Sequence, residues 1–297
     1  MNKPISVLFL FTIILSGCAQ QEKDYVVTIK TNYGEMVAIL YDETPLHKQN
    51  FIKLAKEHYY DSLLFHRVVK DFMIQGGDPT SKKAKPGQQL GAGEAGHTIP
   101  AEFNPKFFHE RGALSAARQA DEVNPTKASS GNQFYIVQGK VLQPEELKLL
   151  QFDQRKLGQG LQQFIQNPVH KPTLDSLNQF YSAQDMISFE KKVYSIVPQI
   201  EKETGFKIKK ETSEERNKIY TTTGGTPFLD GEYTVFGKVI QGLDVLDKIA
   251  ALQVDPLSRP QEDVRMFVSI KEMSKKKIEK EYGYQYPAKS VGKSSRQ

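Results

Sequence analysis

A positively charged donor, an amide side chain and large apolar side chains stand close together in the stretch "FHRVVKDFMIQGG". His66 and Arg67 interrupt an apolar run that is typical of a buried strand. Phe72, Met73 and Gln75 follow at once. An arginine stays charged at any ordinary pH. The stretch contains no nucleophile and no pair of metal ligands, so we expect it to bind and to donate hydrogen bonds rather than to form a covalent intermediate.

Short apolar runs on both sides of this stretch predict strands, and turn signals such as Asn-Tyr-Gly separate them. Two longer segments, 45–60 and 242–252, place apolar residues near helical spacing. Eight strands with an interior that side chains can fill favour a closed antiparallel barrel, here with two capping helices. The predicted strands cover residues 26–31, 35–40, 63–69, 72–76, 112–118, 132–137, 234–240 and 265–273.

Residues 140–222 break this pattern, because they lose the two-residue period and become rich in Glu, Lys, Gln and Leu. Pro144, followed by two glutamates, is a helix start. Pro198 predicts the end or a kink of a later helix. Thr212 and Glu215 match a capping box. We therefore predict an inserted helical module of roughly three helices that emerges from a barrel loop, where insertions are tolerated.

The N-terminal residues carry an export signal. Lys3 precedes an apolar run over residues 5–15 that is too short to span a bilayer comfortably, as in a secretory signal peptide. The following "LSGC" resembles the lipobox of bacterial lipoproteins, in which the cysteine is acylated and becomes the first mature residue. We therefore expect a signal peptide over 1–17, a lipid anchor at Cys18, which is the only cysteine, and a short tether over 18–24.

This anchor predicts a location in the cell envelope of a bacterium, most simply at the outer membrane facing the periplasm. The chain of 297 residues has a net charge of +5. Residues 275–297 contain seven Lys or Arg and two Glu, so the rest of the chain is formally neutral. We expect this basic tail to be disordered. A nucleic-acid partner is not expected, because its groove would need basic residues in the folded part.

Three segments in this order resemble the cyclophilin family of peptidyl-prolyl cis–trans isomerases: "FHRVVKDFMIQGG", "SAARQADEVNPTKASSGNQFYIV" and "TPFLDGEYTVFGKV". The resemblance implies one barrel built from residues 25–139 and 223–274, interrupted by the helical insertion. It also implies an enzyme that acts on proline-containing segments of unfolded or folding exported proteins. No cofactor is expected.

The chemistry of this family accounts for the residue types. An X–Pro amide rotates slowly, because its C–N bond has partial double-bond character and a barrier of about 18–20 kcal/mol. In the twisted amide the proline nitrogen gains a lone pair, which a cationic donor can stabilise. By resemblance Arg67 is this catalytic donor, and Gln75 holds it. The resemblance assigns the other residues as follows: a proline slot of Phe72, Met73, Tyr135 and Leu229; a peptide groove of Ala117, Arg118 and Gln133; a rim of Phe228 and Tyr233; and His66 beside the arginine.

Four of these positions depart from the pattern of many family members. Tyr135 replaces a phenylalanine and brings a hydroxyl group to the slot. Phe228 replaces a tryptophan, Arg118 an asparagine and Tyr233 a histidine. None of these changes removes the arginine or the slot, so they bear on cyclosporin affinity more than on catalysis.

Other classes of site have less support in the sequence. "GAGEAG" at 91–96 matches a dinucleotide-binding pattern, but no buried strand precedes it and no helix follows it. No H-E-x-x-H motif, Cys–His cluster or G-x-S-x-G motif occurs, so we expect neither a metal site nor that type of serine hydrolase. The alternative function is a non-catalytic module that binds proline-containing peptides, or a holdase chaperone whose insertion captures clients.

Overall fold

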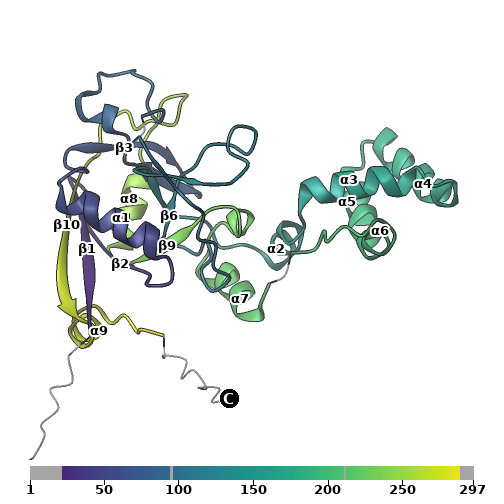
Figure 1. Ribbon diagram of the computed structural model, residues 1–297. Coiled ribbons are helices and arrows are strands. Elements are labelled where there is room, and N and C mark those ends of the chain that lie inside the picture. The colour runs from purple at the N-terminus through teal and green to yellow at the C-terminus, as the bar shows by residue number, and fades with distance from the viewer. Residues whose placement is uncertain (1–21, 94–95, 211, 288–297) are drawn as a thin grey trace, which may run out of the picture.

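The computed structural model describes residues 22–93, 96–210 and 212–287. In this part of the chain eight strands close into a barrel with the order β1-β10-β3-β4-β8-β6-β9-β2, and neighbouring strands run antiparallel (Figure 1). The predicted eight-stranded barrel is therefore confirmed. The strands are β1 (Lys23–Thr31), β2 (Gly34–Leu40), β3 (Leu63–Val69), β4 (Met73–Gly76), β6 (Ala113–Ala116), β8 (Phe134–Val137), β9 (Val235–Gln241) and β10 (Arg265–Ser274).

The hairpin between β1 and β2 shows how the local sequence sets the register. Thr31 pairs with Gly34, and its hydroxyl donates a hydrogen bond of 3.0 Å to the Gly34 carbonyl. Gly34 has φ of +128°, and a Cβ atom there would lie 2.7 Å from Val245 Cγ2. A glycine is therefore required both by the turn and by the helix that packs on it.

Two helices, α1 (Pro45–Lys56) and α8 (Leu243–Ala250), pack against the barrel and complete its main core. Phe51 of α1 contacts the ring of Phe134 on β8 at 5.4 Å between centroids. Leu246 and Ile249 of α8 are fully buried in the same core. Burial of such side chains stabilises the barrel by about 1.5–3 kcal/mol each. A short sheet of β5 (Thr98–Ile99) and β7 (Ser129–Ser130), which was not predicted, lies outside the barrel.

The insertion contains six α-helices in the described residues, rather than roughly three. Asp153 caps a new helix by accepting a hydrogen bond from the Lys156 amide at 3.0 Å, so the helix that begins at Pro144 ends early. The last helix is capped by Ser213, whose hydroxyl accepts a hydrogen bond from the Arg216 amide, and not by the predicted Thr212. The helices are α2 (Pro144–Leu150), α3 (Gln154–Ile165), α4 (Lys171–Ser182), α5 (Met186–Ser195), α6 (Val197–Thr204) and α7 (Glu214–Thr222).

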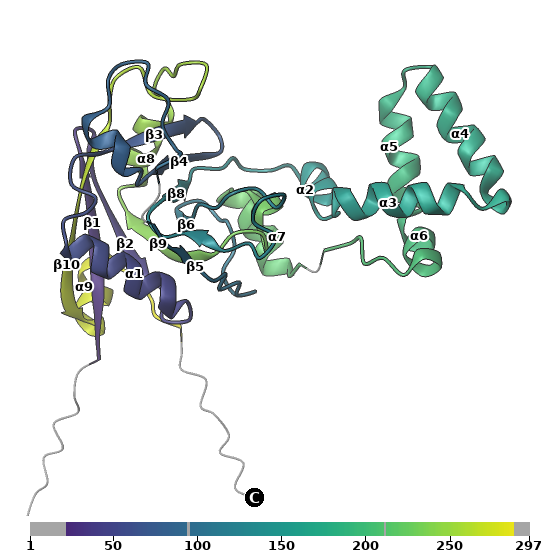
Figure 2. The ribbon, with the colours of Figure 1, turned by 45° about the horizontal axis from the view of Figure 1, so that its top comes forward.

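These helices fall into two groups. Helices α3 to α6 form a lobe, residues 153–208, which projects away from the barrel and has its own buried core around Phe164 and Ile200 (Figure 2). Helices α2 and α7 stay with the barrel, because Leu147 and Tyr220 pack together with Phe108. The predicted single module therefore divides into this lobe and a base, which consists of α2 and α7 and packs on the barrel.

The neck between lobe and base is a short two-stranded bridge. Phe152 pairs with Lys209 in antiparallel fashion. The Lys210 amide donates to Gln151 O at 2.7 Å, and the Asp153 amide donates to Ile208 O at 2.8 Å. The chain therefore leaves the base and returns to it at adjacent points.

The basic C-terminal segment is ordered over its described part, so the prediction of a disordered tail is wrong for residues 275–287. Lys275 to Tyr282 form helix α9, and Ile278 is completely buried against Val26 and other barrel residues. The tail was misjudged because its charges dominate the count, although Ile278 and three partly buried tyrosines of this segment pack against the barrel, namely Tyr282, Tyr284 and Tyr286. Residues 288–297 lie outside the described part.

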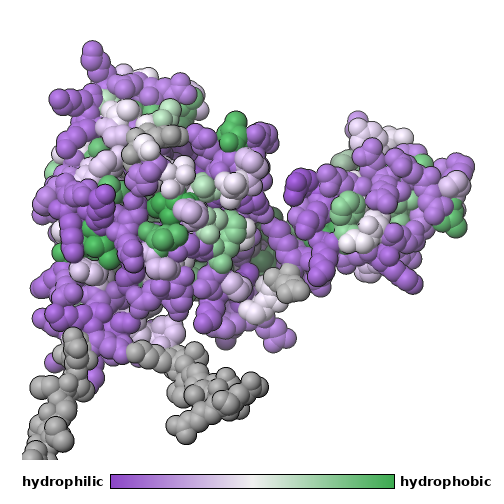
Figure 3. Space-filling model, in the orientation of Figure 1, coloured by the Kyte–Doolittle hydropathy of each residue, from purple (hydrophilic) through white to green (hydrophobic). Residues whose placement is uncertain are grey.

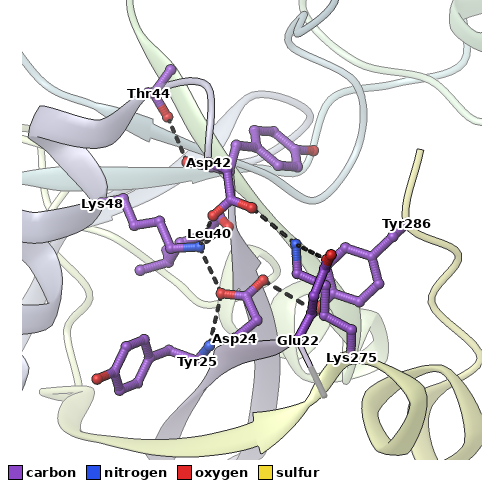
Figure 4. Close-up of polar contacts among 10 residues, drawn as sticks. Glu22, Asp24, Tyr25, Leu40, Asp42, Thr44, Lys48, Lys275 and Tyr286 are labelled. Atoms are coloured by element: carbon purple, nitrogen blue, oxygen red, sulfur yellow. Dashed lines mark hydrogen bonds and ion pairs between the residues drawn. The ribbon is translucent and has the colours of Figure 1, made fainter. Parts of the chain in front are cut away.

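Hydrogen bonds and ion pairs fix this helix to the barrel (Figure 4). The Tyr286 hydroxyl donates to Asp24 at 3.0 Å, and Lys275 pairs with Asp42 at 3.0 Å. Lys48 of α1 contacts both carboxylates at 2.6 Å. Within the described residues no helix is long and apolar enough to cross a membrane.

Candidate functional site

The site is built on the pairing of β3 with β4. Arg67 pairs with Gln75 after an irregularity in the ladder that follows Phe65. The two side chains meet on the outer face, where Arg67 Nη1 donates to Gln75 Oε1 at 3.2 Å. Gln75 Nε2 in turn donates to Gln133 Oε1 at 3.1 Å, and Gln133 Nε2 donates to Gly91 O at 2.9 Å. A chain of amides therefore fixes the orientation of the guanidinium group.

Beside Arg67 lies a small hollow of about 100 Å³. Met73 lies on β4 and Tyr135 lies on the neighbouring strand β8. Gln75 of β4 pairs directly with Tyr135. The Phe72 ring lies 5.8 Å from the guanidinium carbon, within the range of a cation–π contact. The hollow is lined by nine of the predicted residues: Arg67, Phe72, Met73, Gln75, Ala117, Arg118, Tyr135, Leu229 and Tyr233.

The two arginines of the hollow differ in their partners. Arg118 is buried, its guanidinium lies 4.5 Å from the centre of the Tyr233 ring, and it forms an ion pair of 2.6 Å with Asp121. Its Nε also donates to Glu232 O at 2.8 Å. Arg67 is exposed and hydrogen-bonds to a neutral amide, and no described carboxylate forms an ion pair with it. The charge of Arg118 is thus neutralised by its ion-pair partner, and its side chain serves as a wall of the hollow. The charge of Arg67, in contrast, is available to a ligand.

Three predicted residues do not line the hollow. Phe228 is 45% exposed, with its ring 5.6 Å from that of Phe72, which places it at the rim. Gln133 lies behind Gln75 as a supporting group. His66 is buried next to Gly91, where an added Cβ atom would lie 3.5 Å from its Nε2, and burial lowers its pKa to about 4. The irregularity in the ladder between Phe65 and Arg67 interrupts the alternation of faces at His66. Its side chain does not line the hollow, so a role beside the arginine stays a prediction.

The sequence did not reveal a buried network behind Tyr135. The Tyr135 hydroxyl lies 2.9 Å from His109 Nε2, and His109 Nδ1 lies 3.0 Å from Asp230 Oδ1. A carboxylate only accepts, so we assign the proton of His109 to Nδ1, and Nε2 then accepts from Tyr135. Burial lowers the pKa of His109, which favours this neutral ring. The only signal was the Tyr135 hydroxyl itself, since a buried hydroxyl needs a partner.

This network reaches the insertion. Asp230 Oδ2 accepts a hydrogen bond of 2.7 Å from the hydroxyl of Tyr220 on α7. Arg216, one turn earlier on α7, lies 3.6 Å from the same carboxylate. Asp230 directly follows the turn η3 (Pro227–Leu229), which carries Phe228 and Leu229 of the site. Helix α7 therefore holds the loop that forms one wall of the hollow.

The remaining predictions concern groups outside this hollow. In the described residues no group of three or more His, Cys, Asp or Glu side chains is placed to hold a metal ion. Cys18, the predicted lipid anchor, lies outside the described part. The loop over 91–96 is described except for residues 94–95, and Gly91 and Gly93 accept the hydrogen bonds of Gln133. The described part of this loop therefore supports the site from behind.

Comparison with known families agrees with this architecture. The model of the cyclophilin type peptidyl-prolyl cis-trans isomerase/CLD family matches residues 26–155 and 204–270. The unmatched residues between these two parts, 156–203, lie within the lobe. The family match thus includes the barrel together with helices α2 and α7.

Similar proteins carry the same name. The chain is 30% identical over 237 residues to a putative peptidyl-prolyl cis-trans isomerase of Staphylococcus saprophyticus, covering 79% of this chain and 85% of that protein. It is 31% identical over 241 residues to a putative bifunctional phosphatase/peptidyl-prolyl cis-trans isomerase of Streptococcus pyogenes, covering 80% of this chain but 37% of that protein. A cyclophilin type isomerase of Cryptosporidium parvum, solved in the presence of the dipeptide Ala-Pro, aligns with 20% identity and a TM-score of 0.46, covering 83% of this chain and 98% of that one. The chain belongs to the cyclophilin-type peptidyl-prolyl cis–trans isomerases.

Proposed function

We propose that Arg67 catalyses X–Pro isomerisation by donating a hydrogen bond to the proline nitrogen when the amide is twisted. The single observation that carries this proposal is the guanidinium of Arg67, which is held by Gln75 at the edge of an apolar hollow without a carboxylate partner among the described residues. The planar amide nitrogen has no lone pair to offer, so this bond forms only as the amide twists. Such a difference between ground state and transition state is what accelerates a reaction.

The hollow supplies the second requirement, which is to hold one side of the amide while the other turns. Met73, Tyr135 and Leu229 offer apolar surface to a proline ring, and Arg67 stands beside them. A hydrogen bond from a charged donor contributes about 1.5–3 kcal/mol, which corresponds to an acceleration of roughly 10- to 150-fold. The remaining acceleration would come from orientation of the bound peptide.

We further propose that the enzyme acts in the bacterial cell envelope. The support is the N-terminal sequence, in which an apolar run ends at Cys18 within a lipobox-like "LSGC". Acylation of Cys18 would anchor the barrel at the outer membrane, facing the periplasm. Its substrates would then be proline-containing segments of exported proteins during folding.

The direct experiment is isomerisation of a short Ala-Ala-Pro-Phe peptide by the soluble form, from which Cys18 and all preceding residues are removed. An isomerase raises the rate of cis–trans exchange in proportion to its concentration. Peptide binding without acceleration would instead show a non-catalytic binding module. A protein that neither binds the peptide nor accelerates its exchange, but suppresses the aggregation of an unfolded protein, would be a holdase.

A further inference from the structure

A second and larger hollow, of about 460 Å³, lies between the barrel and the base of the insertion. On the barrel side its lining includes Phe103 and Pro105, and on the insertion side it includes Leu150 of α2 and Tyr220 of α7. On the face of the barrel seen in Figure 3, hydrophobic side chains are scattered among hydrophilic ones. We refer to this hollow as the base groove.

The walls of the base groove are held together by several contacts. Arg216 of α7 donates to Pro105 O at 2.5 Å and lies 5.0 Å from the centre of the Phe108 ring. Tyr220 is buried and bonds to Asp230. Because these contacts join α7 to two barrel segments, residues 105–108 and Asp230, the groove is formed before any ligand arrives.

The base groove and the proline hollow share a wall. Tyr233 lines both hollows, and the neighbouring Glu232 lines the base groove while its carbonyl accepts from Arg118 of the proline hollow. A polypeptide that places its proline against Leu229 therefore meets Tyr233 next, and the base groove beyond it. This continuity identifies the occupant as the same substrate chain rather than a separate ligand.

The lining also fits a polypeptide. Phe103 is 42% exposed and offers free apolar surface, as does the half-buried Leu150. The side-chain amides of Gln151 and Asn217 line the same hollow. Gln151 Nε2 donates to Asn217 Oδ1 at 3.3 Å, which leaves Gln151 Oε1 to accept from a peptide backbone and Asn217 Nδ2 to donate to it. The lining also contains charged side chains, among them Lys156 and Lys210. Apolar surface surrounded by such polar groups suits an extended segment with a large apolar side chain.

We propose that the base groove binds the segment of substrate that flanks the isomerised proline and selects an apolar side chain there. This proposal rests on the proposed function, because it takes the small hollow as the proline site. It makes the insertion part of the substrate surface through α2 and α7. Short peptides would occupy only the proline hollow, whereas protein clients would occupy both.

The test compares direct binding of two fluorescein-labelled peptides by anisotropy. One is Ala-Ala-Pro-Phe, and the other is a 12-residue peptide with the same centre and apolar flanking residues. The variant is Phe103→Ala, and the matched control is Phe267→Ala, since Phe267 on β10 is similarly exposed at 46% and lines neither hollow. Truncation of an exposed aromatic anchor should cost about 1 kcal/mol of binding energy.

For Phe103→Ala we expect the Kd of the long peptide to rise about fivefold relative to that of the short one. Phe267→Ala should leave this ratio at the wild-type value. An unchanged ratio in Phe103→Ala, or an equal change in both variants, would overturn the proposal. Binding needs no turnover, so a wild-type protein that binds both peptides but does not isomerise them would refute only the catalytic proposal.

Discussion

The bond between Tyr220 and Asp230 gives a prediction that can be worked out from the structure. The substitution Tyr220→Phe removes one hydroxyl from a buried side chain and keeps its ring against Phe108. Asp230 would lose the 2.7 Å bond from Tyr220 but would keep the two bonds from His109, at 2.8 Å from the backbone amide and 3.0 Å from the ring. The hydrogen bonding of its carboxylate is therefore weakened, but the carboxylate keeps two donors.

Hydrogen bonds to a charged group contribute about 1.5–3 kcal/mol, and the remaining partners place this loss near the lower end. We expect Tyr220→Phe to lower the free energy of unfolding by about 1.5–2 kcal/mol. The measurement is the urea midpoint from circular dichroism, with an unchanged slope as the sign of an intact native state. Because Asp230 holds the loop of Leu229, kcat/KM for the short peptide should fall as well.

The matched control is Tyr181→Phe, since Tyr181 lies in the insertion on α4 and is 66% exposed. It should change neither the urea midpoint nor kcat/KM. If Tyr220→Phe is as stable and as active as Tyr181→Phe, the reasoning fails, because the base of the insertion would then not support the loop of the site.

Four further predictions concern the lobe, the buried histidine, the pH–rate profile and the N-terminus. Replacing residues 153–208 by a two-residue turn should leave kcat/KM for the short peptide within about twofold of wild type, because the neck closes at adjacent residues; a large loss would show that the lobe shapes the site. Burial lowers the pKa of His66 from its ordinary 6.5 to about 4, so the unfolded chain binds the proton more tightly. Stability should therefore be fully present above pH 6.5 and fall by about 3 kcal/mol as the pH drops to 4, and urea midpoints in His66→Asn should show a smaller decrease. With this histidine neutral, the pH–rate profile should be flat between pH 6 and 8, whereas a bell-shaped profile would implicate a titrating group. Cys18→Ala should move the protein from the membrane fraction to the soluble fraction of an expressing bacterium, and a variant that stays with the membrane would refute the lipid anchor.

The barrel and most of the hollow could be predicted because their signals are local. Strand periodicity and turn signals located eight strands, and the motif around Arg67 located the surface on which Arg67 and Gln75 pair. Periodicity could not place His66, because the irregularity in the ladder between Phe65 and Arg67 interrupts the alternation of faces there. The motif match placed it beside Arg67, whereas in the structure it is buried and does not line the hollow.

The network behind Tyr135 could not be predicted, because His109, Asp230 and Tyr220 come from distant parts of the chain. No single one of these residues has an unusual local pattern.

The insertion was misjudged for a related reason. Composition marks residues 140–222 as helical, but only tertiary packing separates the lobe from a base that belongs to the barrel.

The C-terminal helix α9 was likewise not predicted, because its packing could not be read from its composition. Its charges suggested a solvated tail, whereas Ile278 and the ion pairs of Lys275 fix it to β1 and its neighbours. Short helices gain most of their stability from such contacts and little from their own sequence.

The most direct test of the account is the kcat/KM of Arg67→Ala and Arg67→Lys for the short proline peptide, measured on folded soluble protein. Arg67 is exposed and bonds only to the neutral amide of Gln75 and weakly to Met73 among the described residues, so its loss should leave the barrel folded. The account predicts that Arg67→Ala loses about 30- to 100-fold in kcat/KM, and that Arg67→Lys recovers part of it, because a point charge replaces the planar donor. An Arg67→Ala variant with near-wild-type turnover would contradict the claim that this guanidinium stabilises the twisted amide.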